Sequence, residues 1–207
     1  MRRISVSDLD SYRWYKQNED MTLEELLARL RKETPASLPM LAGSALHRFF
    51  EHASSEGQET PAIEVDGFRF AFDCDIDMEL PTVRELKGEV QVDTPSGPVT
   101  LVGIVDGMDS AIYDYKLTGR FDAEKLAESY QWRCYLMMFN ASRFVYRVFV
   151  GKEDSDGVGF DGNAFSQWTI REYHELPVYR YPGMEADVVG QVSEFAAFIN
   201  QYLPERT

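Results

Sequence analysis

The sequence predicts an α/β protein in which a mixed central β-sheet, containing a meander of strands, is flanked by helices. Three observations lead to this prediction. The first third of the chain has helical patterns, residues 63–118 have the patterns of strands, and helices and strands then alternate to the C-terminus. This order of elements is typical of a mixed α/β architecture. With 207 residues, 44% of them hydrophobic, the chain can form one domain, 1–207, with a substantial core.

Three helices are expected before the first strand, over residues 7–17, 22–33 and 41–53. The first begins at Ser7, a residue type that caps helix N-termini. The second begins at Thr22, and Glu25 follows three residues later in a capping-box pattern. Pro35 and Pro39 are expected to end this second helix, because proline does not continue a helix.

The strand region is expected over residues 63–118. It contains VDGFRF with a DG turn, then GEVQV, the loop TPSGP, TLVGIVD and AIYDYKL. A helix over 122–141 follows, then the strands RFVYRVFV and FSQWTIREY on either side of a Gly/Asp-rich loop at 151–163. The last helix, 184–203, has apolar residues at a period close to 3.6.

Asp114 and Lys116 are two residues apart, so on a strand both side chains project from one face. Asp106 lies at the end of the preceding strand, and the two strands are expected to form a hairpin. Asp106 lies opposite Asp114 only if the hairpin loop has an odd number of residues, for example Asp109–Ala111. An even number would place the two carboxylates on opposite faces of the sheet.

Two facing carboxylates repel each other unless a divalent cation lies between them. Mg²⁺ and Mn²⁺ prefer oxygen ligands and retain water, which can attack a phosphodiester. A lysine beside such a site can orient or help to deprotonate that water, or stabilise negative charge in the transition state. D-x-K also arises by chance, and the alternative interpretation is a surface salt bridge.

His47 and Glu51 lie one helical turn apart in the segment GSALHRFFEH, so they share a helix face. An imidazole nitrogen among oxygen ligands shifts the metal preference toward Mn²⁺. The alternative interpretation is a histidine that only packs or lies at the surface.

Gln131 and Tyr135 have the same spacing in ESYQWRCYLMMF. Their amide and hydroxyl groups can form hydrogen bonds with the site lysine, a water molecule or a phosphate. Taken alone, this segment also fits an ordinary amphipathic helix, with Tyr135 in the core.

The order of these motifs resembles that of the RecB-type nucleases of the PD-(D/E)XK superfamily. The matching residues are Gly43 to His47, Glu89, Gly103 to Asp106, Asp114 with Lys116, and Gln131 with Tyr135. The opening ISVSDLDSYRWY is similar to the S-x-S-x-L-x-x-Y start of that group. The resemblance covers roughly residues 4–150 and implies a restriction-endonuclease-like core.

The resemblance also implies roles for individual residues. The implied metal ligands are His47, Asp106, Asp114 and the backbone carbonyl of Tyr115. The implied catalytic residues are Lys116, Asp114 and Asp106. Residues expected to support the site or the DNA are Gln131, Tyr135, Glu51, Glu89 and Arg120, with Glu89 as an additional acid. Because the spacing from Asp106 to Asp114 is short for the group, Asp109 is a substitute for the first acid.

The activity implied by the resemblance is that of a metal-dependent deoxyribonuclease, an exonuclease that processes DNA ends in recombination or repair. The implied cofactor is Mg²⁺ or Mn²⁺. No nucleotide cofactor is expected, because the chain lacks a P-loop. No iron–sulfur cluster is expected either, because relatives that hold one carry four cysteines and this chain has only Cys74 and Cys134. The implied partners are DNA with free ends and a single-strand annealing protein, and relatives include oligomers. The alternatives are a catalytically inactive nuclease-fold module that binds a protein or DNA, and a structural α/β protein with chance motif matches.

The formal net charge of −14 excludes a chain that is basic overall. Nucleic-acid binding usually requires a basic face, so DNA contacts are expected to be local or bridged by metal ions. Candidate local cations are Arg2, Arg3, Arg13, Lys16, Arg48, Lys116, Arg120 and Lys125. The sequence has no apolar run of membrane-spanning length and no signal-peptide pattern, which predicts a cytoplasmic protein without a membrane partner.

Overall fold

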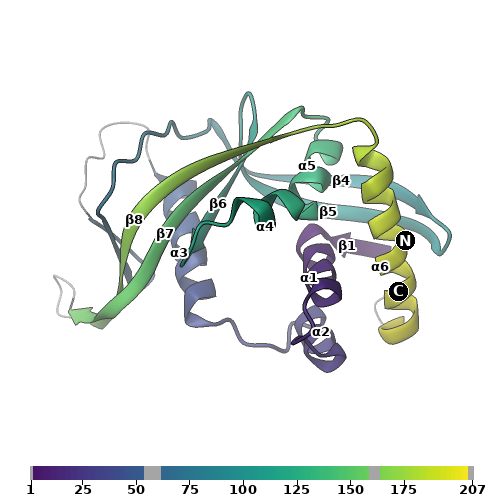
Figure 1. Ribbon diagram of the computed structural model, residues 1–207, viewed down its shortest axis with the longest axis horizontal. Helices are drawn as coiled ribbons and strands as arrows, with labels where there is room; N and C mark the ends of the chain where they lie inside the picture. The colour runs from purple at the N-terminus through teal and green to yellow at the C-terminus, as the bar shows by residue number, and fades with distance from the viewer. Residues whose placement is uncertain (1, 54–61, 159–163, 205–207) are drawn as a thin grey trace.

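The computed structural model describes residues 2–53, 62–158 and 164–204. The strands are β1 (Arg2–Ser5), β2 (Ala62–Val65), β3 (Phe68–Phe72), β4 (Val83–Thr94), β5 (Gly97–Met108), β6 (Ile112–Thr118), β7 (Arg143–Val158) and β8 (Ala164–Tyr179). The helices are α1 (Val6–Gln17), α2 (Leu23–Leu30), α3 (Leu38–His52), α4 (Ala123–Glu128), α5 (Tyr130–Met138) and α6 (Met184–Tyr202). Figure 1 shows their arrangement, with β1 beside the end of α6.

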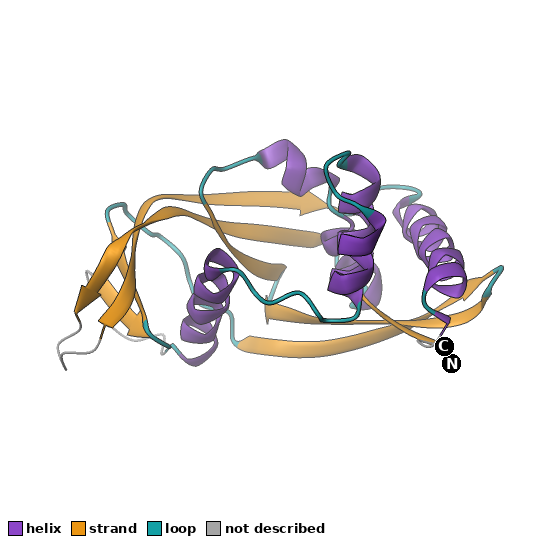
Figure 2. Cartoon of the chain, turned by 90° about the horizontal axis from the view of Figure 1, so that it is seen from below, coloured by secondary structure: helices purple, strands orange, loops and turns teal. Residues whose placement is uncertain are grey.

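The strands form one sheet in the order β1-β5-β6-β7-β8-β3-β2, with β4 paired to β5. The pairs β1–β5, β6–β7 and β3–β8 are parallel, and the other pairs are antiparallel. Helices flank this mixed sheet, as the view from below also shows (Figure 2). The predicted fold class is therefore confirmed. No helix in the described part of the chain is long and apolar enough to cross a membrane.

The helix starts agree only partly with the sequence prediction. The N-cap of α1 is Ser5 and not Ser7: the Ser5 hydroxyl accepts a hydrogen bond from the Asp8 N–H, while the Ser7 hydroxyl lies 3.0 Å from that of Ser5. The capping box between Thr22 and Glu25 is confirmed. The helix that it starts ends at Leu30, three residues before the predicted end.

Pro39 begins a helix rather than ending one. It lies in the first turn of α3, where the missing N–H of proline has no intrahelical partner to lose. This helix therefore starts at Leu38, three residues before the predicted start. The helix predicted over 122–141 is divided at Ser129, whose extended ψ of 141° ends α4 and whose side chain caps α5.

The predicted DG turn is confirmed. Asp66 and Gly67 have φ angles of 51° and 79°, as a two-residue turn between β2 and β3 requires. Strand β7 extends to Val158, into the predicted loop at 151–163, and part of that loop lies outside the described residues.

The buried side chains form two clusters. The first lies between the sheet and α1, α2, α5 and α6, and it includes Leu9, Val105, Tyr146 and Phe195. The second lies beneath α3 and includes Tyr115. The two clusters meet at the strands β5 and β6, where the candidate site lies.

Candidate active site

One edge of strand β5 pairs with two different strands, with a gap between them. Strand β4 pairs with it along its length, from Gly97 to Met108. On the other edge, β1 pairs with Val99–Val102 and β6 pairs with Gly107 and Met108. In the register of the described strands, residues 103–106 have no neighbour on this edge. The backbone and side chains of 103–106 can therefore interact with side chains from other elements.

The hairpin between β5 and β6 has an odd loop, which is the condition for placing Asp106 opposite Asp114. Met108 pairs with Ile112, which leaves a loop of Asp109–Ala111. In this register Asp106 corresponds to Asp114, as the two-carboxylate prediction requires. The ladder ends before that pair, because the two strands separate.

The separation of β5 and β6 follows from the buried clusters to which their side chains belong. A regular ladder would place Val105 opposite Tyr115, on one face of the sheet. Instead Val105 belongs to the first buried cluster and Tyr115 to the second. The strands therefore rotate away from each other beyond their last pair, and the carboxylates of Asp106 and Asp114 lie at this fork.

Asp106 is held by two donors from different elements. The Tyr115 N–H donates to its Oδ2 at 2.7 Å, and His47 Nδ1 lies 3.3 Å from the same oxygen. Burial raises the pKa of the Asp106 carboxyl, but the hydrogen bond and charge of His47 and the Tyr115 N–H outweigh it and leave this pKa below its ordinary value. For His47, burial lowers the pKa of the imidazole, while Asp106 outweighs that effect and raises it.

Asp114 is more deeply buried, at 4% exposure. Its Oδ1 accepts a hydrogen bond from Gln131 Nε2 at 2.7 Å, and its Oδ2 forms an ion pair with Lys116 Nζ at 2.6 Å. Burial raises the pKa of Asp114 to about 6, with Asp106 adding to the effect and Lys116 opposing it. The pKa of Lys116 is raised, because Asp114 and Asp106 together outweigh its burial.

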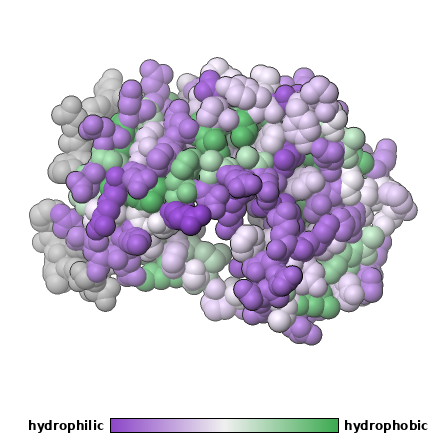
Figure 3. Space-filling view, viewed as in Figure 1, coloured by the Kyte–Doolittle hydropathy of each residue, from purple (hydrophilic) through white to green (hydrophobic). Residues whose placement is uncertain are grey.

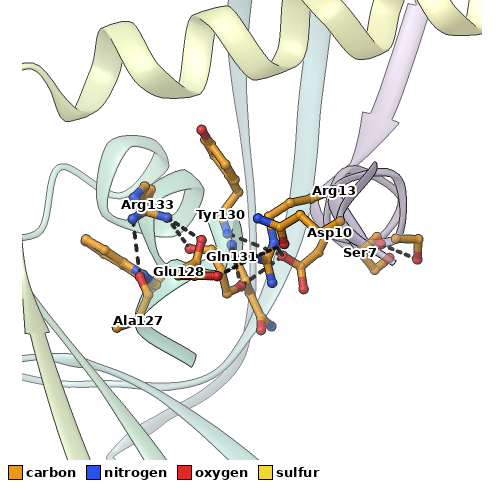
Figure 4. A network of polar contacts seen from close by, with 12 residues as sticks. Ser7, Asp10, Arg13, Ala127, Glu128, Tyr130, Gln131 and Arg133 are labelled. Carbon is orange, nitrogen blue, oxygen red and sulfur yellow. Dashed lines mark hydrogen bonds and ion pairs between the residues drawn. The ribbon is translucent and has the colours of Figure 1, made fainter. Parts of the chain in front are cut away.

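The start of α5, which presents Gln131, is attached to α1 (Figure 4). Asp10 Oδ1 accepts hydrogen bonds from the Ser129 hydroxyl at 3.0 Å and the Tyr130 N–H at 3.3 Å. Arg13 lies 3.4 Å from the same oxygen. The Ser129 hydroxyl in turn accepts from the Gln131 N–H at 3.0 Å. This network fixes the first turn of α5 and so directs Gln131 toward Asp114.

Tyr135 lies one turn further along α5 and contacts the unpaired edge of β5. Its hydroxyl donates to the Ile104 carbonyl at 2.8 Å, which satisfies one of the backbone groups at the fork. A Cβ atom on Gly103 would lie 2.5 Å from the Tyr135 ring. The glycine of the G-x-x-D motif is therefore required for the close approach of this ring.

The end of α3, which presents His47, is attached to β4. Arg84 Nη1 donates to the carbonyl oxygens of Phe50, Glu51 and Ala53 at 3.0, 3.1 and 2.5 Å. These are carbonyls of the last helical turn, which have no partner within the helix. Arg84 thereby fixes the orientation of α3 relative to β4.

Glu85 is a candidate site residue that sequence reasoning missed. It corresponds to Asp106 in the β4–β5 register, between the pairs Arg84–Gly107 and Leu86–Val105, and has a φ angle of 50°. Burial, then the charge of Asp106, raises its pKa. The register could have identified it, because a short turn between β4 and β5 places Glu85 opposite Asp106.

The other predicted residues divide into two groups. Glu51 lies close enough to Glu85 to raise its pKa further. Glu89 was expected to be the additional acid, but it lies four residues from Glu85 and forms an exposed ion pair with Arg3 at 3.4 Å. Arg120 pairs with Asp122 on the surface.

The carboxylate of Asp109 lies away from His47 and does not take the position of the Asp106 carboxylate. It accepts hydrogen bonds from the Thr82 N–H at 3.1 and 3.0 Å, which closes the turn beside the hairpin loop. Asp106, by contrast, contacts His47. The structure therefore brings together Asp106, Asp114, Lys116, His47 and Gln131, and it places Glu89, Arg120 and Asp109 in other contacts.

The donor chemistry of this group fits a divalent cation, although the side chains are not arranged as a ready set of ligands. Within the described residues, no three His, Cys, Asp or Glu side chains are grouped as metal ligands. Instead His47 and Lys116 neutralise the two carboxylates. The buried Asp114 Oδ2 contacts the Lys116 ammonium, and a carboxylate oxygen of this kind is the ligand that a hard cation prefers.

The chain matches no protein-family model and no curated protein. It is similar in structure to SSO0001, with a TM-score of 0.53 and 12% identity over 96% of this chain and 77% of that chain. The alkaline exonuclease LHK-Exo from Laribacter hongkongensis also matches, with a TM-score of 0.45 and 15% identity over 99% of this chain and 92% of that chain. The structure of LHK-Exo in complex with dAMP matches with a TM-score of 0.42 and 14% identity, over 96% of this chain and 88% of that chain. At such identities the likeness to SSO0001 shows the fold alone.

Proposed function

We propose that this chain is a metal-dependent DNA nuclease of the RecB-type PD-(D/E)XK group, in which the fork between β5 and β6 forms the active site. The supporting observation is the fork itself. It brings Asp106 and Asp114 together with Lys116 and with His47 of α3, in one coupled set of charges. A surface salt bridge, the alternative interpretation of D-x-K, does not account for an aspartate with only 4% of its surface exposed.

The residues that would hold a divalent cation are Asp106, Asp114 and His47, together with the Tyr115 carbonyl and Glu85. Mg²⁺ or Mn²⁺ would lower the pKa of a water molecule and neutralise charge on the phosphate. His47 has to lose its proton to become a ligand, because a protonated imidazole has no free lone pair. Gln131 holds Asp114 Oδ1, so that Oδ2 faces Lys116.

Lys116 would hold its proton at Nζ and orient the attacking water or stabilise the negative charge that develops on the phosphate. Its raised pKa favours the charged form, which suits charge stabilisation better than action as a general base. Arg84 and Tyr135 are positioning residues: Arg84 fixes α3, and Tyr135 satisfies the backbone of β5 at the fork.

We place the activity at DNA ends, as an exonuclease in recombination or repair, with a single-strand annealing protein as a partner for the exposed strand. The test is the release of nucleotides from end-labelled linear duplex DNA with Mg²⁺ or Mn²⁺, beside a covalently closed circle. Lys116→Ala should lose at least two orders of magnitude in rate, the usual effect of removing a group that stabilises transition-state charge. The matched control is Lys152→Ala, which removes an exposed lysine of β7.

Each outcome has a definite meaning. Degradation of the linear DNA that requires metal and Lys116 supports the proposal, and the labelled end gives the polarity. Cleavage of the closed circle would make the enzyme an endonuclease. If the folded protein cleaves nothing with either metal, the inactive nuclease-fold module becomes the better hypothesis.

A further inference from the structure

A cleft of about 670 Å³ adjoins the candidate active site. It lies beside the divided edge of β5, and Tyr135 lines it together with residues from four other elements. These include Arg3 and Ser5 of β1, Ser7 of α1, Lys87 of β4, and Val102 and Ile104 of β5. Glu89 and Gly103 of the sequence motifs also line it, whereas Asp106, Asp114, Lys116 and His47 do not.

The floor of the cleft is apolar and continuous with the catalytic face of β5. Ile104 and Val102 precede Asp106 by two and four residues, so all three project from one face of the strand. Each such step along a strand is about 6.8 Å. Ile104 is 43% exposed, which is high for a large aliphatic side chain in the middle of a sheet. The opposite face of the same strand carries Leu101 and Val105, which are buried in the first cluster.

The sides of the cleft are polar and include cations. Lys87 is opposite Ile104 in the β4–β5 register and forms no ion pair with any residue that the structure describes. Arg3 lies on the other side of β5 and forms an ion pair with the exposed Glu89, which also lines the cleft. The hydroxyls of Ser5 and Ser7, 3.0 Å apart, line the end nearest β1. In the space-filling view, hydrophilic side chains cover much of the face that is drawn, with hydrophobic side chains between them (Figure 3).

We propose that this cleft binds a single, unpaired nucleic-acid strand and leads it to Asp106, with bases on Ile104 and Val102 and phosphates beside Lys87 and Ser7. This inference rests on the proposed nuclease function and specifies the form of its substrate. In a duplex the apolar faces of the bases are stacked inside, so an apolar floor next to the scissile phosphate has nothing to contact. An unpaired strand exposes those faces, and bases of any sequence can then pack on apolar side chains.

The charges agree with one strand better than with two. The cleft has two cations, Arg3 and Lys87, and one carboxylate, Glu89, so it can neutralise few phosphates, whereas a duplex would bring twice as many phosphates toward a protein of net charge −14. The continuity of the floor with Asp106 also favours a nucleic acid over an acidic peptide, which would have no group to present to the carboxylates of the fork.

The experiment is equilibrium binding of fluorescently labelled oligothymidylate, measured by anisotropy in EDTA so that no cleavage occurs. A hairpin duplex of the same nucleotide count is the comparison. Ile104→Ser should weaken binding of the single strand roughly fourfold or more, the equivalent of losing one buried methylene group. The matched control is Val189→Ser, at an exposed valine of α6. Lys87→Gln should also weaken binding, and its control is Lys152→Gln.

The outcomes separate this inference from the proposed function. Preference for the single strand, with losses in the two cleft variants and not in the controls, supports the cleft whether or not the protein cleaves DNA. Equal losses in cleft and control variants, or tighter binding of the hairpin, would overturn it. Wild-type nuclease activity without any effect of Ile104→Ser and Lys87→Gln on oligothymidylate binding would leave the nuclease proposal intact and refute the cleft.

Discussion

At the scale of single residues, the two aspartates of the fork differ because their surroundings differ. Asp106 receives hydrogen bonds from a backbone N–H and a histidine, and its pKa is lowered. Asp114 is more deeply buried and its pKa is raised to about 6. Identical side chains whose pKa values are displaced in opposite directions are typical of catalytic sites. Both pKa shifts apply to the protein without a bound metal ion, so they predict measurable effects on its stability and on metal binding.

The first prediction concerns Asp114→Asn without metal. A carboxyl whose pKa is raised by folding stabilises the protein below its unfolded pKa, and this stabilisation is lost as the pH rises through the folded value, here between about 4 and about 6. At pH 7 the amide avoids the cost of a buried charge, and the lost ion pair with Lys116 offsets part of the gain. We expect the variant to be more stable by about 1 kcal/mol at pH 7, and this advantage to disappear near pH 4.

Urea unfolding in EDTA at a series of pH values measures this difference. Asp93→Asn, at an exposed aspartate of β4, is the control and should follow the wild type. Clear destabilisation of Asp114→Asn at pH 7 would show that Asp114 is held by favourable contacts rather than kept under repulsion.

The second prediction concerns His47 and protons. Asp106 raises the pKa of its imidazole, so part of the population is protonated near neutral pH and has to release that proton to ligate a cation. Calorimetry with Mn²⁺ at pH 6.5, in two buffers of different ionisation enthalpy, should detect proton release. His47→Asn should release fewer protons and bind Mn²⁺ more weakly. Equal proton release by both proteins would exclude His47 as a ligand.

At the scale of elements, the register decides which residues reach the site. The sequence left an odd and an even hairpin loop open, and the observed register has the odd loop, Asp109–Ala111, that places two carboxylates on one face. Glu89 was predicted as the additional acid, whereas Glu85 is the residue of β4 opposite Asp106; both lie on the same face of β4, and only the exact turn between β4 and β5 distinguishes them. In the same way, the sequence alone does not distinguish Ser5 from Ser7 as the N-cap of the first helix.

The fork itself could not be predicted from local patterns. Val105 and Tyr115 are both buried, so each strand has the pattern of an ordinary core strand. The sequence contains no local signal that they belong to different cores. The rotation of the strands results from packing against α3 on one side and α5 on the other, which is a tertiary effect.

The third prediction compares the two motif glycines. Gly103→Ala would place a Cβ atom 2.5 Å from the Tyr135 ring, which has to move and release the Ile104 carbonyl. We expect destabilisation by about 1–3 kcal/mol, as in other overpacked sites. Gly43→Ala in α3 is the matched comparison, because the nearest atom, Leu117 Cβ, is 4.0 Å away. That variant should gain about 0.5–1 kcal/mol from helix propensity.

Thermal or urea unfolding of both variants in parallel measures these effects. If Gly103→Ala is as stable as the wild type, Tyr135 does not require the close approach described above. Loss of stability in Gly43→Ala would indicate a contact of α3 beyond Leu117.

At the scale of the whole molecule, one sheet with two cores contains a short stretch of β5, residues 103–106, that has a neighbouring strand on one edge and none among the described strands on the other. The helices α1 and α5 are joined by the Asp10 network, and α3 is joined to β4 by Arg84, so each side of the fork is fixed independently. The net charge of −14 restricts this molecule to local contacts with a polyanion. The sequence predicted this restriction, and the nucleic-acid contact that we propose at the cleft beside the fork would be such a local contact.

The fourth prediction is the salt dependence of oligothymidylate binding. For single strands, the logarithm of the affinity falls with the logarithm of the salt concentration with a slope of about −0.7 per neutralised phosphate. The cleft provides Lys87, and Arg3 that is paired with Glu89, so a slope between about −0.7 and −1.4 is expected. Anisotropy titrations at several KCl concentrations measure it. Lys87→Gln should make the slope less steep by about 0.7, and Lys152→Gln should leave it unchanged. A slope steeper than about −4 would require a broad basic face and would place the nucleic acid on another surface of the molecule.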